Sequence, residues 1–134
     1  MADGKKVLVA EDDPDIRNLI VYSLQFAGFA VMEATNGIEA VTMAQAEKPD
    51  IILLDVRMPK MSGYEACAEL KSEATTQSIP VVFLSARGQE TEIKHGLELG
   101  AEEYIIKPFA PDELQRRVTG ILERCGRAKG RQQS

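Results

Sequence analysis

The sequence predicts an α/β fold, an open five-stranded parallel sheet with helices on both faces. Two observations lead to this fold class. Five short apolar runs alternate with five segments that carry helix signals, and four of the runs are almost continuously apolar, which is typical of parallel strands buried on both faces. Right-handed crossovers between such strands put helices on both sides of the sheet. The predicted strands are Val7–Ala10, Ala30–Ala34, Ile51–Leu54, Val81–Leu84 and Glu103–Ile106.

The first predicted helix has signals at both ends. Asp13 can cap its N-terminus, and Pro14 suits the first helical position. Gly28 can end the helix. The apolar residues between these ends recur at helical spacing: Ile16, Leu19, Ile20, Leu24 and Ala27. The strand that follows, Ala30–Ala34, is less uniformly apolar than the others, which suits an edge position.

The second and third predicted helices begin with similar signals. Asn36-Gly37-Ile38-Glu39 and Ser62-Gly63-Tyr64-Glu65 each place an acid three residues after a capping side chain, as in a capping box. The fourth helix carries Ile93 and Leu97 on one face, and Gly100 ends it.

The fifth predicted helix opens at Pro111 and has Arg124 near its end, where a positive charge suits the helix dipole. One apolar stripe runs along it: Leu114, Val118, Ile121 and Leu122. The residues after it are basic and carry no large apolar side chain. We therefore expect one domain over residues 1–125 and a basic flexible tail, or the start of a linker, over residues 126–134.

Composition narrows the classes of function. The chain has 134 residues and a net charge of -5, which argues against a general nucleic-acid binder. No apolar run approaches the roughly 18–20 residues of a membrane span. Cys67 and Cys125 lack CxxC spacing and suit a reducing compartment. We expect a cytoplasmic protein without direct nucleic-acid contact or membrane insertion.

Polar residues follow four of the five predicted strands. Glu11 and Asp12 come after the first, Asp55 after the third, Ser85 after the fourth and Lys107 after the fifth. In open α/β sheets, ligands bind beyond the carboxyl ends of the strands. Each residue alone has an ordinary alternative, such as a loop acid or a turn hydroxyl, so the argument depends on their joint placement.

Three carboxylates in one crevice require a countercharge, because like charges about 4 Å apart repel by about 4 kcal/mol at an effective dielectric of 20. Mg²⁺ is a hard cation that prefers such oxygen ligands, and Lys107 adds a second positive charge. Asp55 would then be a plausible nucleophile in a phosphoryl transfer, where catalysis is mostly positioning and electrostatics.

The sequence resembles the receiver domain of two-component response regulators, in particular chemotaxis-regulator-like single domains, from about Lys6 to Arg124. The resemblance implies a flavodoxin-like fold with strand order 2-1-3-4-5. The segments that carry it are Val7–Pro14, Leu53–Pro59, Ser62–Glu65, Ile79–Ala86, Gly100–Tyr104 and Lys107–Phe109.

The resemblance implies roles for the acidic residues. Asp55 would be the phosphoacceptor. Asp12 and Asp55 would bind Mg²⁺ directly, together with the backbone carbonyl of Arg57. Glu11 would act mainly through a bound water, and it stands where the family more often has aspartate.

The remaining site residues also take their expected roles from the resemblance. Lys107 would bridge to the phosphoryl oxygens, and the Lys107-Pro108 peptide bond would be cis. Ser85 would follow the phosphoryl group, and Tyr104 would turn from an exposed to a buried position. Three residues would modulate the access of water to the phosphoryl group: Arg57, Ala86 and Arg87.

The implied function is a signalling switch. The protein would accept a phosphoryl group from a sensor histidine kinase or a histidine phosphotransfer protein. It would then control a downstream effector protein through its fourth helix, fifth strand and fifth helix, and a homodimer through residues 87–122 is a further expectation. It would not be an enzyme with a separate substrate, although it would catalyse its own phosphorylation and slow dephosphorylation.

Alternatives from other classes fit less well. A haloacid-dehalogenase-like phosphatase needs a second acid two residues after the nucleophile, where this chain has Arg57. A flavodoxin-like cofactor binder needs a phosphate loop of small residues, where Glu11, Asp12 and Asp13 would repel the phosphate.

A further alternative is that the chain is the receiver domain of a longer transcription factor. Glu102, Glu103 and Arg117 lie where winged-helix regulators often place the charges that pair receivers into dimers. The single-domain form is preferred, because nothing after Gly126 resembles an output domain.

Overall fold

The computed structural model describes residues 4–86 and 88–133, with side chains up to Cys125. Its five strands form one parallel sheet in the order β2-β1-β3-β4-β5, with β2 at one edge, which confirms the predicted fold class and strand order. The elements are β1 (Lys6–Ala10), α1 (Pro14–Phe26), β2 (Ala30–Ala34), α2 (Gly37–Glu47), β3 (Ile51–Asp55), α3 (Gly63–Ser72), β4 (Val81–Ser85), α4 (Glu90–Glu98), β5 (Glu103–Ile106) and α5 (Pro111–Gln133).

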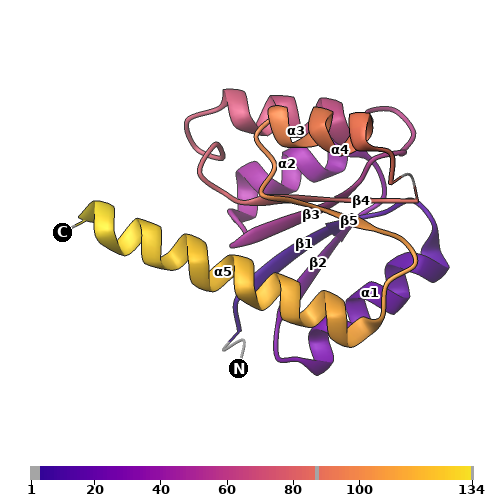
Figure 1. Cartoon of the computed structure of the whole chain (residues 1–134), viewed down its shortest axis with the longest axis horizontal. Helices are drawn as coiled ribbons and strands as arrows, with labels where there is room; N and C mark the ends of the chain where they lie inside the picture. Colours follow the sequence, from indigo (N-terminus) through magenta and orange to yellow (C-terminus); the bar gives the residue numbers. More distant parts are fainter. Residues whose placement is uncertain (1–3, 87, 134) are drawn as a thin grey trace.

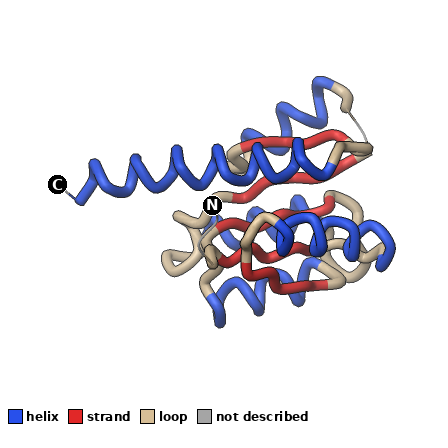
Figure 2. Tube along the Cα trace, turned by 90° about the horizontal axis from the view of Figure 1, so that it is seen from below, coloured by secondary structure: helices blue, strands red, loops and turns tan. Residues whose placement is uncertain are grey.

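Helices cover both faces of the sheet (Figure 1). Helices α1 and α5 lie on one face, and α2, α3 and α4 lie on the other, so the molecule has three layers. Figure 2, seen from below, shows the long helix α5 running along the strands. Successive side chains of a strand point to opposite faces. Val7 and Val9 of β1 accordingly pack in the core under α1 and α5, whereas Leu8 and Ala10 pack in the core under α2 and α3.

The register of the strands brings their carboxyl ends to one edge. Ala10 of β1 pairs with Leu54, so Glu11 follows at the level of Asp55. In the same way Ser85, the last residue of β4, pairs with Ile106. Because Lys107 comes directly after Ile106, all the polar residues expected at the strand ends reach the same edge.

The predicted helix starts are present. The Asp13 carboxylate accepts hydrogen bonds from the backbone N–H groups of Asp15 and Ile16, at 2.9 and 3.3 Å. Ser62 and Glu65 form a complete capping box at the start of α3. These caps satisfy N–H groups that a helix leaves without internal partners.

The start of α2 differs from a full capping box. Asn36 accepts a hydrogen bond from the N–H of Glu39 at 2.9 Å. The Glu39 carboxylate, however, accepts from the backbone N–H and the hydroxyl of Thr35, at 2.8 and 2.9 Å, instead of from Asn36. Those hydrogen bonds lower the pKa of Glu39.

Helix α5 runs from Pro111 to Gln133 and extends beyond the sheet (Figure 1). The segment 126–133, expected as a flexible tail or the start of a linker, therefore continues the backbone of this helix. The domain boundary at residue 125 stays a prediction. Among the helices of the described chain, none combines the length and the apolar character that a bilayer crossing requires.

Gly63 should be strictly required in the turn between β3 and α3. A Cβ atom at this position would collide with the backbone carbonyl of Asp55, and the Gly63 N–H donates to the carbonyl of Val56 at 2.9 Å. We expect Gly63→Ala to lower the free energy of unfolding by about 1–3 kcal/mol or more, measured by urea denaturation. Gly120→Ala is the matched control, since a Cβ at Gly120 of α5 meets nothing within 4 Å. Equal losses in both variants would contradict this account.

Candidate functional site

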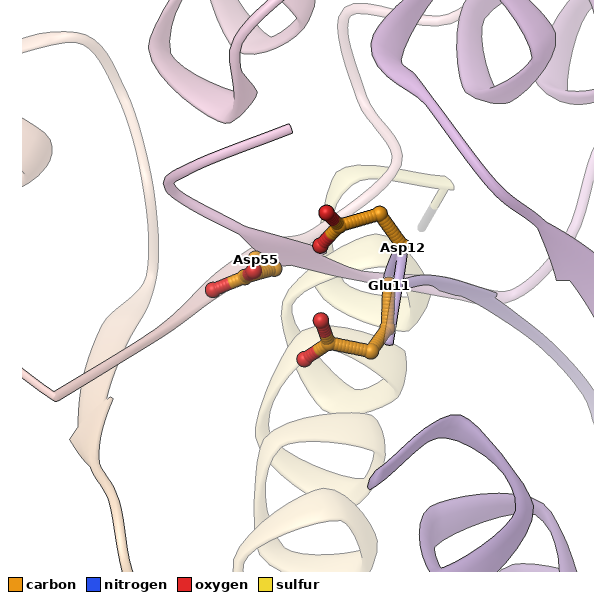
Figure 3. Close-up of side chains that lie close together, drawn as sticks. All are labelled: Glu11, Asp12 and Asp55. Atoms are coloured by element: carbon orange, nitrogen blue, oxygen red, sulfur yellow. The ribbon is translucent and has the colours of Figure 1, made fainter. Parts of the chain in front are cut away.

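Three carboxylates converge at the carboxyl ends of β1 and β3. Glu11 and Asp12 follow β1, Asp55 ends β3, and each offers an oxygen within 4.8 Å of the others. Figure 3 shows the three side chains pointing toward one another. Glu11 and Asp55 are buried, whereas Asp12 is exposed. The structure therefore brings together the acidic residues that the strand ends predict.

Lys107 supplies the positive charge of this cluster. Its Nζ donates to Oε1 of Glu11 at 2.7 Å and to Oδ1 of Asp55 at 3.2 Å. Burial alone would lower the pKa of Lys107, but the hydrogen bond to Glu11 and the nearby charge of Asp55 outweigh it and raise that pKa. The lysine thus stays protonated between the two carboxylates. The Lys107-Pro108 peptide bond is cis in this structure.

Glu11 is the most unusual titratable group of the site. Its pKa is raised from 4.5 to about 7. Burial is the largest cause and the charge of Asp55 contributes in the same direction, whereas Lys107 and the hydrogen bond from the Asp13 backbone partly offset the rise. Both carboxylate oxygens have partners, because Oε2 accepts from the Asp13 N–H at 3.2 Å. The side chain of Glu11, which is one methylene longer than that of aspartate, contacts Lys107 directly.

Arg17 supports the loop after β1 and is not among the site residues expected from the sequence. Its guanidinium donates to the backbone carbonyl of Glu11 at 2.8 Å and pairs with Glu33 of β2 at 3.1 Å. Arg17 comes one helical turn after the cap Asp13, and it is a charged residue on a helix face that turns toward the sheet edge. That position is the one signal by which it could have been found.

A cavity of about 230 Å³ adjoins Asp55, and its lining contains most of the other expected site residues: Asp55, Arg57, Ser85, Ala86 and Lys107. Ser85 is buried, whereas Arg57 and Ala86 are exposed at the rim. Arg87, expected to modulate water access, lies outside the described residues. The cavity gives a small group room beside the Asp55 carboxylate.

The donor set suits a divalent cation. Three carboxylates against one lysine leave an excess of negative charge, and all the side-chain donors are the oxygens that Mg²⁺ prefers. Asp12 also lines a second, larger groove of about 620 Å³ that contains Arg57 and Met58. That groove gives water molecules access to the open side of the acidic cluster.

Tyr104 lies away from the cluster and is only 7% exposed. Tyr104 is expected to start from an exposed position, but its ring is buried beside Phe83, with ring centroids 6.1 Å apart. Its hydroxyl lies 3.5 Å from the hydroxyl of Tyr64 on α3.

The charges considered for dimer formation have partners within the chain. Arg117 pairs with Glu103 at 2.7 Å, and Arg124 lies 3.8 Å from Glu102 and 3.6 Å from Glu103. The face formed by α4, β5 and α5 also exposes two apolar side chains, Leu97 and Ile106. A homodimer through residues 87–122 stays a prediction.

A family model described as the response regulator receiver domain matches residues 7–119. Among curated proteins, the chain is 42% identical over 120 residues to the probable transcriptional regulator ycf27 of Cyanophora paradoxa, and the match covers 90% of this chain and 49% of that protein. The chain spans about half the length of the curated relatives it matches.

Solved structures share the architecture. The chemotaxis protein CheY4 of Vibrio cholerae superposes with a TM-score of 0.82 at 31% identity, covering 87% of this chain and 97% of that one. The receiver domain of sensor histidine kinase PA1611 from Pseudomonas aeruginosa PAO1, with a magnesium ion coordinated in its active site cleft, superposes with a TM-score of 0.81 at 33% identity, covering 92% and 98%. The flavodoxin-like arrangement of five parallel strands is common to all three.

Proposed function

This chain belongs to the response regulator receiver domain family, and we propose that it accepts a phosphoryl group on Asp55 with the help of Mg²⁺. The observation that supports this most directly is the contact of Asp55 with Lys107 at 3.2 Å inside a cluster of three carboxylates. The phosphoryl donor would be a phosphohistidine of a sensor histidine kinase or of a phosphotransfer protein.

The metal would be held by Asp12, Asp55 and the backbone carbonyl of Arg57, with Glu11 acting through a bound water. When bound, Mg²⁺ supplies positive charge that offsets the oxygens of the transferred group. Because Glu11 already holds Lys107 at 2.7 Å, we propose that its main task is to position the lysine and that its effect on the metal is indirect.

The transfer itself would be a displacement at phosphorus. An Asp55 carboxylate oxygen forms the new O–P bond as the P–N bond to the donor imidazole breaks, and the imidazole nitrogen keeps the electron pair. Lys107 Nζ stabilises the phosphoryl oxygens, and the buried Ser85 hydroxyl can donate to one of them. Arg57, Ala86 and Arg87 would modulate how water reaches the acyl phosphate.

The phosphorylated state would be read through α4, β5 and α5. A phosphoryl group adds charge and three strong acceptor oxygens at Asp55, and Ser85 and Tyr104 would pass this change to the face that exposes Leu97 and Ile106. A downstream effector protein in the cytoplasm would bind there.

The proposal is tested by intact-mass measurement after incubation with acetyl phosphate and Mg²⁺. We expect the wild-type protein to gain one phosphoryl group and Asp55→Ala to gain none. Asp112→Ala is the matched control, since Asp112 is an exposed aspartate paired with Arg116 on α5, and it should behave as wild type. A phosphoryl group on the Asp55→Ala protein would refute the assignment.

A second context for the same switch is the receiver of a longer transcriptional regulator. It is favoured by the half-length match to relatives that are named transcriptional regulators. The complete open reading frame distinguishes it from a single-domain regulator.

A further inference from the structure

Tyr64, at the start of α3, contacts two of the three elements that form the face of α4, β5 and α5. Its hydroxyl donates to a carboxylate oxygen of Glu92 on α4 at 2.8 Å and lies 3.5 Å from the hydroxyl of Tyr104 on β5. Its ring packs edge-on against Phe83 and His95, with centroids 5.0 and 4.7 Å away. Helices α3 and α4 lie on the same side of the sheet (Figure 1).

The directions of these hydrogen bonds follow from the chemistry. A phenol has one proton, and the short, charge-assisted contact to Glu92 is the stronger of the two. Tyr64 therefore donates to Glu92, which leaves its oxygen free to accept from the Tyr104 hydroxyl in a long contact of 3.5 Å. Burial, together with the hydrogen bonds to Tyr104 and Glu92, raises the pKa of Tyr64, so its hydroxyl stays protonated.

Gly96 provides the space that the buried Tyr104 occupies. A Cβ at this position, in the last turn of α4, would lie 2.9 Å from a ring carbon of Phe83 and 3.1 Å from a ring carbon of Tyr104. A helix-interior glycine has a stability cost relative to alanine, so its presence here requires a reason. The close approach of α4 to the two rings supplies one.

Helix α4 is held against the sheet by few buried side chains, and Ile93 is its one large apolar side chain that packs, partly buried, against the core. Gly96 is the single buried residue among its nine, and its N-cap residue, Gln89, makes no side-chain capping hydrogen bond. An element with so few buried contacts has low local stability. The Tyr64–Glu92 hydrogen bond therefore adds to the packing of Ile93 and His95 in fixing the position of α4.

We propose that Tyr64 and Gly96 set the resting position of the Tyr104 switch. Tyr64 is a positioning residue that holds the Tyr104 hydroxyl inward and ties α4 in place through Glu92, and Gly96 leaves room for the inward ring. The switch is consequently biased toward its buried position before any phosphoryl group arrives. This rests on the role proposed for Tyr104 in the receiver.

The test uses ¹³C-labelled tyrosine, because the chain has only three tyrosines. Exposure of the Tyr104 ring is measured by NMR as line broadening from a soluble gadolinium chelate, without Mg²⁺ or any phosphoryl mimic. Tyr64→Phe removes one hydroxyl and keeps the ring. We expect the ratio of buried to exposed Tyr104 to fall by up to about tenfold, because the variant loses both the long contact to Tyr104 and the stronger hydrogen bond to Glu92.

Two control variants, Tyr22→Phe and Gly120→Ala, are matched to the test variants Tyr64→Phe and Gly96→Ala. Tyr22→Phe removes the same atom from a ring that is 69% exposed on α1 and should leave Tyr104 protected. Gly96→Ala should expose Tyr104, whereas Gly120→Ala, in open space on α5, should not.

Unchanged protection of Tyr104 in Tyr64→Phe would overturn the proposal, whatever the fate of Gly96→Ala. The measurement needs no phosphorylation, so its failure is distinguishable from failure of the acetyl phosphate experiment.

Discussion

Magnesium ions should stabilise the folded protein by about 2.7 kcal/mol when present at one hundred times their dissociation constant. The reason is that the three carboxylates lie within 4.8 Å of one another only in the folded chain. Urea denaturation at increasing Mg²⁺ concentration measures this as a rising free energy of unfolding. A denaturation midpoint that does not move at millimolar Mg²⁺ would count against the metal site.

Asp55→Asn is the matched variant for this experiment. It removes the repulsion of Asp55 with Glu11 and with Asp12 at the cost of one attraction to Lys107. Losing two repulsions and one attraction is a net gain equivalent to removing one repulsive charge pair. This gain in the free energy of unfolding is at most about 4 kcal/mol at an effective dielectric of 20. We expect Asp55→Asn to be more stable than wild type without metal, and to gain less from Mg²⁺.

Lys107→Met should have the largest effect of any single substitution in the site. Removing one positive group that faces the reacting oxygens typically costs about 10²–10³-fold in rate, and we expect phosphorylation by acetyl phosphate to slow by about that factor. The variant should also lose about 3–5 kcal/mol of stability without metal at pH 8, because Glu11, which is 1% exposed, loses the ion pair that offsets its burial.

The loss of stability in Lys107→Met should depend on pH in a definite direction. The pKa of Glu11 is raised to about 7 in the folded protein from 4.5, and without the lysine it should rise further. Between these values the folded state binds more protons than the unfolded state, so stability falls as pH rises from about 5 to 8. At pH 5 Glu11 is protonated and needs no ion pair. The difference in the free energy of unfolding between wild type and Lys107→Met should therefore be smaller at pH 5 than at pH 8.

Lys94→Met serves as the control, since Lys94 is an exposed lysine on α4. It should keep both the wild-type rate of phosphorylation and the wild-type stability. A Lys107→Met protein that is equally destabilised at pH 5 and pH 8 would show that Glu11 is not the group left without a partner.

The strands and helix starts could be predicted from local signals. Continuous apolar runs specify strands buried on both faces, and residues such as Asp13 and Ser62 cap helices through hydrogen bonds to N–H groups two or three positions away. The convergence of Glu11, Asp55 and Lys107 could also be predicted, because parallel strands with matched register end at the same edge.

The sequence could not specify contacts that depend on packing between elements. The position of Arg17 one turn after Asp13 does not reveal its hydrogen bond to the Glu11 carbonyl, and nothing in the sequence indicates that Tyr64 reaches Glu92 across 28 residues. The expectation that Tyr104 is exposed was wrong for the same reason, because its position depends on packing between elements. Its burial depends on the space left by Gly96 of a different element.

The sequence by itself determined the fold class, the strand order through the family resemblance, and the identity of the residues at the strand ends. Alternation of apolar runs and capping signals acts over a few residues, so it can be recognised along the chain. Only the tertiary structure decided which partner each polar group takes. Glu11 holds Lys107 at 2.7 Å and Tyr104 lies under α4, because side-chain reach and the space between packed helices and strands are set by the assembled layers.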